Sequence, residues 1–511
     1  MNPRKLMIAL LAALTLALAL ASQSHAAEFS LASETWVGVT DNNNIVSFKG
    51  IPFAAPPVAE NRWQPPQPYQ PGPTTHTANR FAAACMQGPH IENWYRDLVE
   101  SLGEDPAVIK SPESGYSEDC LYLNIWSKSL AVNMPVMVWI HGGSNKGGWS
   151  YEPNYHGQML AHKNVVVVSV AYRLGIFGNF SHRELIAEQS GTAGNYGLLD
   201  LVAALEWIQA NIKSFGGNPK NVTILGESAG AANVAYLMAS GKARGLFHKA
   251  IHQSAGYQQH QTGTLQQLTQ NGEMLARQMD VNDLKALRSL SEVELLKGVE
   301  EFMPGLSFDS VARGHGLSAT PGEIFQSGLQ AKVPLMIGTN AHEWLMYIGD
   351  STLDKYLKDY SVSDSKTGID HHLGSLPLAN QLDRIATAYE MLCPSLEMAG
   401  YVAGEQPAYV YQFTRVRQGP HWQSVGAYHG AEIPYVFNTH DDWLTTTDTD
   451  HLLTNMVQQY WVNFAITGNP HGDGLPPWSQ YNNKARNVME LNIPAGMQPA
   501  PDQTLCRLMG Y

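Results

Sequence analysis

The stretch "NVTILGESAG" (residues 221–230) sets a lone serine, Ser228, between two glycines directly after an apolar run. The next residues, "AANVAYLMAS", predict a helix. A serine on so tight a turn between a strand and a helix adopts a strained backbone, which requires glycines two positions before and after it. The pattern therefore predicts a serine hydroxyl raised above the carboxyl edge of a sheet, facing the N-terminal amides of the next helix.

The sequence before this turn alternates apolar strands with helical segments. Strands are predicted in "PVMVWI" (135–140), "NVVVVSVAY" (164–172) and "NVTIL" (221–225). A helix is predicted over 198–212, because apolar residues recur there every three or four positions: Leu198, Leu201, Val202, Leu205, Ile208 and Ile212. Continuous apolar strands alternating with helices are typical of a parallel sheet covered on both faces, so the predicted fold class is α/β.

A serine hydroxyl is a poor nucleophile unless a base removes its proton and an acid orients that base. On this kind of sheet the chain order is serine, acid, histidine. Glu343 is the strongest acid candidate, because it follows a predicted strand (333–338) whose end lies at the same edge as Ser228. His429 is the strongest base candidate, since it follows the strand 408–413 and has small neighbours. Most other histidines have simpler explanations as polar loop residues.

A reaction at Ser228 would also need donors for a developing oxyanion. The glycine-rich segment "WIHGGSNKGG" (139–148) follows a predicted strand directly and is of the type that turns backbone amides toward a nucleophile. The expected donors are the amides of Gly143, Ser144 and Ala229. The alternative is an ordinary flexible turn.

The N-terminus and the overall charge limit where this chain works and what it binds. Basic Arg4 and Lys5, a 16-residue run from 6 to 21 that is apolar except for Thr15, and a Ser-His-Ala pattern predict a secretory signal over 1–26. No later segment has the ~18 consecutive apolar residues of a membrane span. The formal net charge of −13 disfavours a nucleic-acid partner. Residues 27–511 show neither repeats nor a linker, so we expect one large domain and no membrane anchor once the signal is removed.

Four cysteines, Cys85, Cys120, Cys393 and Cys506, form an even number in a chain predicted to be exported. This favours disulfides over a metal site, and the separations do not suit zinc. Three pairings are possible from the sequence. No metal or organic cofactor is predicted.

At this point the sequence resembles the type-B carboxylesterase and cholinesterase family of α/β-hydrolases, from about Glu34 to Cys506. The segments that carry the resemblance are "FKGIPFAAPPVAENRWQPPQP" (48–68), "SEDCLYLNIW" (117–126), 194–230 around Ser228, and "TGNPHGDGLPPWSQY" (467–481). The resemblance implies an α/β-hydrolase fold with a large, mostly parallel twisted sheet flanked by helices.

Transferred to this sequence, the family's nucleophile falls on Ser228, its acid on Glu343, its base on His429, and its oxyanion amides on Gly143, Ser144 and Ala229. The resemblance further implies disulfides Cys85–Cys120 and Cys393–Cys506. It also implies a structural pair between Arg62 and Glu118.

Two departures from the family pattern bear on function. Ser144 stands where the family usually has glycine or alanine, which keeps an amide donor but alters the loop. "AVIKSPESGYSEDC" (107–120) lacks the tryptophan with which cholinesterases bind quaternary ammonium through a cation–π contact. Trp94 lies too early in the same loop and is interpreted as a packing residue, so a choline ester is disfavoured.

The predicted function is that of an exported serine hydrolase, periplasmic or extracellular, that cleaves small-molecule carboxylic esters through an acyl-enzyme. Two alternatives stay open: a binding or adhesion protein on the same scaffold, or a hydrolase of amide, thioester or carbonate bonds. The pocket walls are expected to come from Trp149, from 258–327 and from 344–404.

Overall fold

The computed structural model describes residues 28–31, 34–129, 131–260, 263–281 and 283–511. The predicted signal segment lies outside these residues. The centre of the described part is a sheet of eleven strands in the order β16-β15-β14-β13-β12-β11-β9-β10-β8-β4-β3. In chain order, the bounds of these strands are β3 Val39–Thr40, β4 Ile45–Pro52, β8 Tyr122–Lys128, β9 Met134–Ile140, β10 Val166–Val170, β11 Gly217–Glu227, β12 Lys249–Gln253, β13 Leu335–Asn340, β14 Ala408–Phe413, β15 Asn487–Leu491 and β16 Gly496–Pro499.

Most of this sheet is parallel, as the apolar strand runs predict. The strands from β10 to β15 in the sheet order pair in parallel. The remaining strands, β8, β4 and β3 at one edge and β16 at the other, pair antiparallel. The carboxyl ends of β11, β13 and β14 therefore lie along one edge, where the segments after each strand meet.

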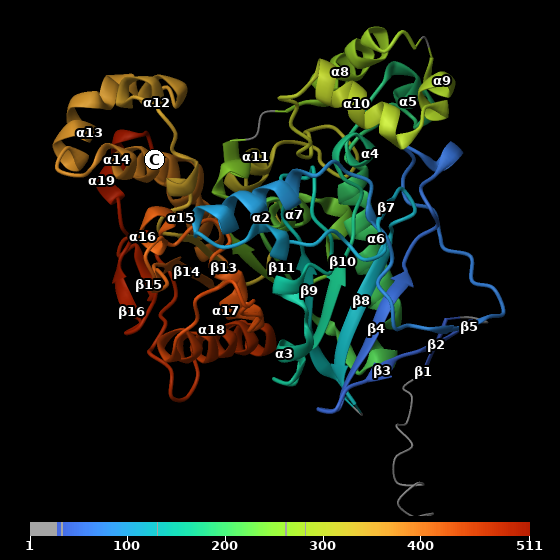
Figure 1. Cartoon of the computed structure of the whole chain (residues 1–511), viewed down its shortest axis with the longest axis horizontal. Coiled ribbons are helices and arrows are strands. Elements are labelled where there is room, and N and C mark those ends of the chain that lie inside the picture. Colours follow the sequence, from blue (N-terminus) through green and yellow to red (C-terminus); the bar gives the residue numbers. More distant parts are fainter. Residues whose placement is uncertain (1–27, 32–33, 130, 261–262, 282) are drawn as a thin grey trace, which may run out of the picture.

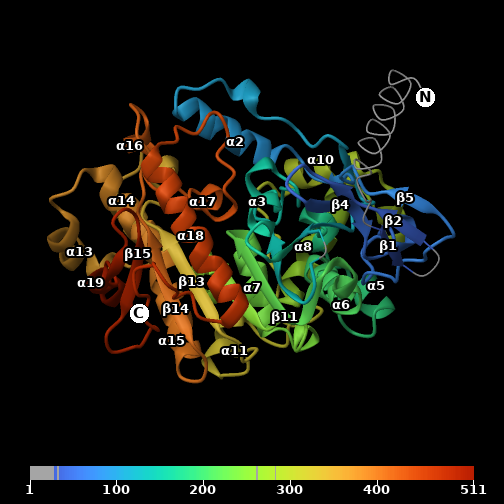
Figure 2. The same ribbon diagram turned by 90° about the horizontal axis from the view of Figure 1, so that it is seen from below.

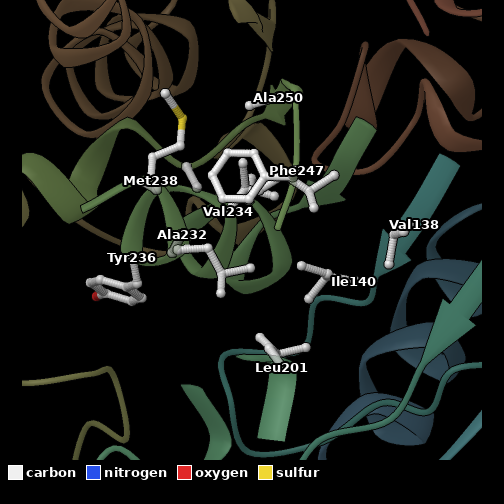
Figure 3. Packing of buried hydrophobic residues seen from close by; sticks show 14 of the residues in the cluster. Val138, Ile140, Leu201, Ala232, Val234, Tyr236, Met238, Phe247 and Ala250 are labelled. Carbon is white, nitrogen blue, oxygen red and sulfur yellow. The ribbon is translucent and has the colours of Figure 1, made fainter. Parts of the chain in front are cut away.

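Helices cover both faces of the sheet because β9 carries large apolar side chains on both sides. Val136, Val138 and Ile140 belong to the apolar cluster that contains α6 (Tyr196–Asn211) and α7 (Ala229–Ala239), part of which Figure 3 shows. The intervening Met137 and Trp139 pack on the other face with α18 (Asp448–Thr467), which contacts β9 and β11 (Figure 2). The predicted helix over 198–212 is α6, but it is buried on more than the predicted stripe.

Two groups of helices extend beyond the sheet, at opposite sides of the view in Figure 1. One group has its own apolar cluster and comprises α4 (Gly175–Gly178), α5 (Arg183–Glu188), α8 (Leu265–Gln278), α9 (Leu284–Ser289) and α10 (Glu292–Phe302). The other comprises α12 (Leu353–Asp359), α13 (Lys366–Leu373), α14 (Leu378–Ala386) and α19 (Gln503–Leu508). None of the helices that the structure describes is long and apolar enough to cross a bilayer.

The bounds of the remaining α-helices are α2 His90–Ser101, α3 Gln158–Ala161, α11 Pro321–Gln326, α15 Cys393–Ala403, α16 Trp422–Val425 and α17 Ile433–Phe437. A π-helical turn at Thr387–Leu392 joins α14 to α15. The smaller sheets contain β1 Glu28–Leu31, β2 Glu34–Val37 and β5 Thr75–Thr77 in one, and β6 Ala84–Cys85 and β7 Tyr116–Ser117 in the other.

Both disulfides implied by the family resemblance are present. Cys85 is bonded to Cys120, and Cys393 is bonded to Cys506. The Arg62–Glu118 pair is present as well: both side chains are buried, and Arg62 Nε donates to Glu118 Oε2 over 2.8 Å. Arg62 also donates to the backbone oxygen of Leu290 at 2.6 Å, so the pair joins the N-terminal segment to the loop between α9 and α10.

Candidate active site

The strand-to-helix turn at Ser228 has the strained backbone that the sequence predicts. Ser228 connects β11 directly to α7 and has φ 56° and ψ −129°, a region that non-glycine residues rarely occupy. A Cβ on Gly230 would lie 2.1 Å from the backbone oxygen of Ile140, and a Cβ on Gly226 would lie 2.5 Å from the carbonyl carbon of Gly230. The two glycines therefore let the turn pack against the end of β9.

The predicted acid and base form a direct pair. Glu343 follows β13 by three residues, and its Oε2 lies 2.7 Å from Nδ1 of His429. Its other oxygen, Oε1, accepts a 2.6 Å hydrogen bond from the backbone nitrogen of Asn340. Glu343 is 1% exposed, so the carboxylate that contacts the imidazole is almost fully buried.

Two side chains on α14 and the π-helical turn support the acid loop from behind. The backbone nitrogen of Glu343 donates to Thr387 Oγ1 over 3.2 Å, and the backbone nitrogen of Trp344 donates to Asp383 Oδ1 over 3.0 Å. Asp383 is fully buried, and burial raises its pKa to about 7. These contacts attach the acid-bearing loop to a helix rather than leaving it free at the sheet edge.

A second carboxylate, Glu227, lies on the other side of the imidazole, and the sequence patterns did not single it out. Its Oε1 is 3.3 Å from Nε2 of His429, and the residue is 6% exposed. Burial raises the pKa of Glu227, and the neighbouring charge of His429 opposes that shift. Burial by itself would lower the pKa of His429, but the charges of Glu227, Glu343 and Glu432 outweigh it and raise that pKa above its ordinary value. The place of Glu227 directly before Ser228 is visible in the sequence, but that position alone does not indicate a role beside the histidine.

The glycine-rich segment after β9 lies against the serine turn. A Cβ on Gly142 would be 3.1 Å from the Cβ of Ser228. Gly143 and Ser144 have φ values of 98° and 57°, and in the described part of the chain no hydrogen bond from their amide nitrogens is found. Ala229 is the first residue of α7, where amides have no acceptor within the helix. In the described residues, none of these three amides has a hydrogen-bond acceptor.

Ser228, Glu343 and His429 open into one cavity of about 530 Å³. Its walls are rich in aromatic side chains: Trp94, Tyr95, Trp139, Tyr155, Tyr257, Trp344, Tyr347, Tyr428 and Trp443. Gly143 and Ser144 also line it. A large, mostly apolar cavity with a few convergent polar groups is typical of a small-molecule site.

The predicted origin of these walls is only partly right. Residues 258–327 contribute Gly305, Ser307 and Asp309, and residues 344–404 contribute Trp344, Tyr347, Glu390 and Met391. The prediction for Trp149 is wrong, because this side chain is buried in the apolar cluster behind the wall. Sequence patterns missed α2, which adds His90, Ile91, Trp94 and Tyr95.

Trp94 has a larger role than the packing assigned to it from the sequence. It does pack against the core, with its ring edge-on to Tyr95 at 4.8 Å between centroids. It also lines the cavity, and its Nε1 donates to the hydroxyl of Tyr347, which lies at the end of the short turn after Glu343. The wall contributed by α2 and the wall contributed by the acid loop therefore touch.

Known proteins resemble this chain over nearly its whole length. Residues 35–509 match the carboxylesterase family. Cocaine esterase of Homo sapiens is 32% identical over 509 residues, covering 91% of this chain and 86% of that protein. Para-nitrobenzyl esterase of Bacillus subtilis (strain 168) is 31% identical over 491 residues, covering 91% of this chain and 94% of that protein.

The fold is also that of solved structures in the same group. A PNB esterase structure superimposes with a TM-score of 0.80 at 29% sequence identity, covering 94% of this chain and 99% of that one. A thermophilic PNB esterase gives a TM-score of 0.81 at 28% identity, with the same coverage. The sequence match and the shared fold show that the chain belongs to the carboxylesterase family, as a carboxylic ester hydrolase with the α/β-hydrolase fold.

Proposed function

We propose that the protein is an exported serine esterase in which Ser228, His429 and Glu343 cleave carboxylic esters through an acyl-enzyme. The observation that carries the proposal is the 2.7 Å contact between His429 Nδ1 and Glu343 Oε2 in the same cavity as Ser228 on its strained turn. A base held by a buried acid, in the same cavity as a serine hydroxyl, is what a serine nucleophile needs.

In the first half of the reaction, His429 Nε2 takes the proton from Ser228 Oγ while the oxygen attacks the ester carbonyl carbon. The amides of Gly143, Ser144 and Ala229 hold the resulting oxyanion, and His429 returns the proton to the departing alcohol. In the second half, His429 takes a proton from water while the water oxygen attacks the acyl carbon. The bond between that carbon and Ser228 Oγ then breaks, the acid leaves, and His429 returns the proton to Ser228 Oγ. Glu343 orients the imidazole and stabilises its charged form throughout.

The cavity favours esters with bulky apolar or aromatic groups, because its walls are largely aromatic. The names of the relatives give very different substrates. One is cocaine esterase, and another is a fumonisin B1 esterase of Sphingopyxis macrogoltabida, which is 32% identical and covers 86% of this chain and 82% of that protein. Export is supported by the two disulfides, since such bonds persist in oxidising compartments.

The decisive experiment replaces the nucleophile. Ser228→Ala should leave a folded protein and lower kcat/KM for a nitrophenyl ester by about 10³-fold or more, the effect of losing a triad member. The matched control is Ser395→Ala, a buried serine in α15 that does not line the cavity; it should keep its activity. Turnover that survives in Ser228→Ala would refute the assignment.

A covalent probe and matched substrates separate the alternatives. An active-site fluorophosphonate should label the wild-type protein and spare Ser228→Ala, whereas a binding protein on this scaffold would react in neither form. Rates on ester, thioester, carbonate and amide substrates with the same acyl group should be highest for the ester; a faster amide would change the proposed bond.

A further inference from the structure

Asn145 directly follows the proposed oxyanion donors Gly143 and Ser144 but does not line the catalytic cavity. Its neighbours Gly143, Ser144 and Lys146 line the catalytic cavity, whereas Asn145 is 6% exposed and belongs to the interior behind the loop. The family resemblance assigns no role to this position. A polar side chain buried here requires hydrogen-bond partners.

Those partners connect the loop to three other segments. Asn233 Nδ2, on α7, donates to Asn145 Oδ1 over 2.9 Å. Asn145 Nδ2 donates to Asp309 Oδ1 over 3.0 Å, in the loop between α10 and α11. The backbone nitrogen of Gly175 donates to the backbone oxygen of Asn145 over 2.6 Å. The loop is thus attached both to the helix that begins after Ser228 and to the cavity wall that contains Asp309.

The backbone at this point is strained and needs such support. Gly143, Ser144 and Asn145 have consecutive positive φ values of 98°, 57° and 54°. Asparagine tolerates this region better than most residues, but a non-glycine residue remains there only where its surroundings determine the conformation. The Ser144 N–H belongs to the peptide between Gly143 and Ser144, so its direction depends on the backbone torsions of these two residues. The hydrogen bonds of Asn145 hold the residue that directly follows them.

We propose that Asn145 is a positioning residue for the oxyanion hole, an inference that rests on the proposed function. Its hydrogen bond with Asn233 fixes the position of the Ser144 amide relative to Ser228, because α7 starts immediately after the nucleophile. The bond to Asp309 fixes the other side of the carboxamide. Asn145 touches no substrate in this role; it acts through the orientation of the amide beside it.

The test is a substitution that removes the carboxamide. Asn145→Ala should lower kcat by about 10- to 10²-fold with little change in KM, since misplacing an oxyanion donor weakens only transition-state binding. A trifluoromethyl ketone, which forms an oxyanion on the serine, should lose affinity in the same proportion. Asn233→Ala should act in the same direction, and the double variant should fall short of the product of the single effects.

Asn195 provides a matched control. It also has a positive φ, 56°, is 1% exposed, and bonds to the same connecting loop: its Nδ2 donates to the oxygen of Val311 at 2.9 Å, and its Oδ1 accepts from the nitrogen of Val311 at 2.8 Å. Asn195→Ala should lower the unfolding midpoint while kcat and ketone affinity stay near wild type.

Several outcomes would overturn the inference. One is Asn145→Ala with unchanged kcat, and another is an equal loss of kcat in Asn195→Ala. If Asn145→Ala does not fold, Asn233→Ala provides the test, and its unchanged kcat and ketone affinity count against the proposal. Turnover that survives Ser228→Ala would refute the proposed function itself, whereas normal dependence on Ser228 with an unaffected Asn145→Ala refutes only this inference.

Discussion

Glu227 is the second carboxylate in contact with the imidazole of His429, besides Glu343. It lies 3.3 Å from His429 Nε2, while Glu343 holds Nδ1 at 2.7 Å. An imidazole between two carboxylates binds its proton more tightly than a free one. The two carboxylates therefore raise the pKa of His429, and the proposed base works only in its unprotonated form.

Replacing Glu227 by glutamine should therefore shift the pH dependence of activity. The charge of Glu227 raises the pKa of His429, so Glu227→Gln should lower the apparent pKa of the base. Activity of a base requires its unprotonated form, hence the acid limb of the kcat/KM profile should move to lower pH. Because the groups titrate together, the limb reports an apparent value for the cluster.

Glu152→Gln is the control for this shift. Glu152 is also buried in the cavity wall, but it is bonded to Tyr95 Oη at 2.9 Å and to the nitrogen of Trp149 at 3.1 Å. Its substitution should move the limb much less than Glu227→Gln. A limb that stays in place, or moves to higher pH, in Glu227→Gln would contradict the assigned electrostatics.

Local patterns were enough to predict that Ser228, Glu343 and His429 converge at one edge, because each follows a strand of a parallel sheet. They were not enough for Glu227, whose position before the serine has no distinctive pattern, nor for Trp149, whose direction depends on the turn after the glycine-rich segment. The proposed chemical roles of the three residues remain predictions.

At the scale of elements, the turn between β11 and α7 is the feature with the least tolerance for added atoms. Gly230→Ala should prevent folding or lower the unfolding free energy by several kcal/mol, since its Cβ would lie 2.1 Å from a backbone oxygen of β9 and overpacking by even one group costs about 1–3 kcal/mol. Gly241→Ala is the control, because nothing lies within 4 Å of its Cβ position. Urea unfolding midpoints compare the two; equal midpoints would contradict the packing argument.

The strands themselves were largely predictable, because continuous apolar runs of five to nine residues have few alternatives. The predicted runs at 135–140, 164–172 and 408–413 correspond to β9, β10 and β14. The position of α2 was not predictable, because its place over the cavity follows from long-range contacts between the Cys85–Cys120 loop and the acid loop. This helix contributes four of the missed cavity residues, and most of the others come from 139–155 and 428–444.

At the scale of the whole molecule, the Cys393–Cys506 disulfide closes a long loop, with a sequence separation of 113. In the chain-entropy model, a bond across a loop of this length restricts the unfolded chain by up to about 4–5 kcal/mol. The double variant Cys393→Ser, Cys506→Ser should therefore unfold at a clearly lower urea concentration. Removing the Cys85–Cys120 pair, with a separation of 35, should cost somewhat less. An unchanged midpoint for the first variant would contradict this account.

The organisation of residues 27–511 as one domain and the signal over 1–26 stay predictions. Several apolar clusters exist in the described chain, and the one formed by α4, α5 and α8 to α10 is separate from the two on the faces of the sheet. Whether these clusters unfold together, as one domain would, depends on contacts between them, which composition and periodicity do not encode.

The aromatic walls also give the protein an optical signal of its own. Trp94, Trp139, Trp344 and Trp443 surround the cavity, out of 12 tryptophans in the chain. A ligand that displaces solvent from these indoles should shift their emission wavelength or intensity. Equilibrium titrations with unreactive ester analogues can then be followed by intrinsic fluorescence, without a dye or a chromogenic leaving group.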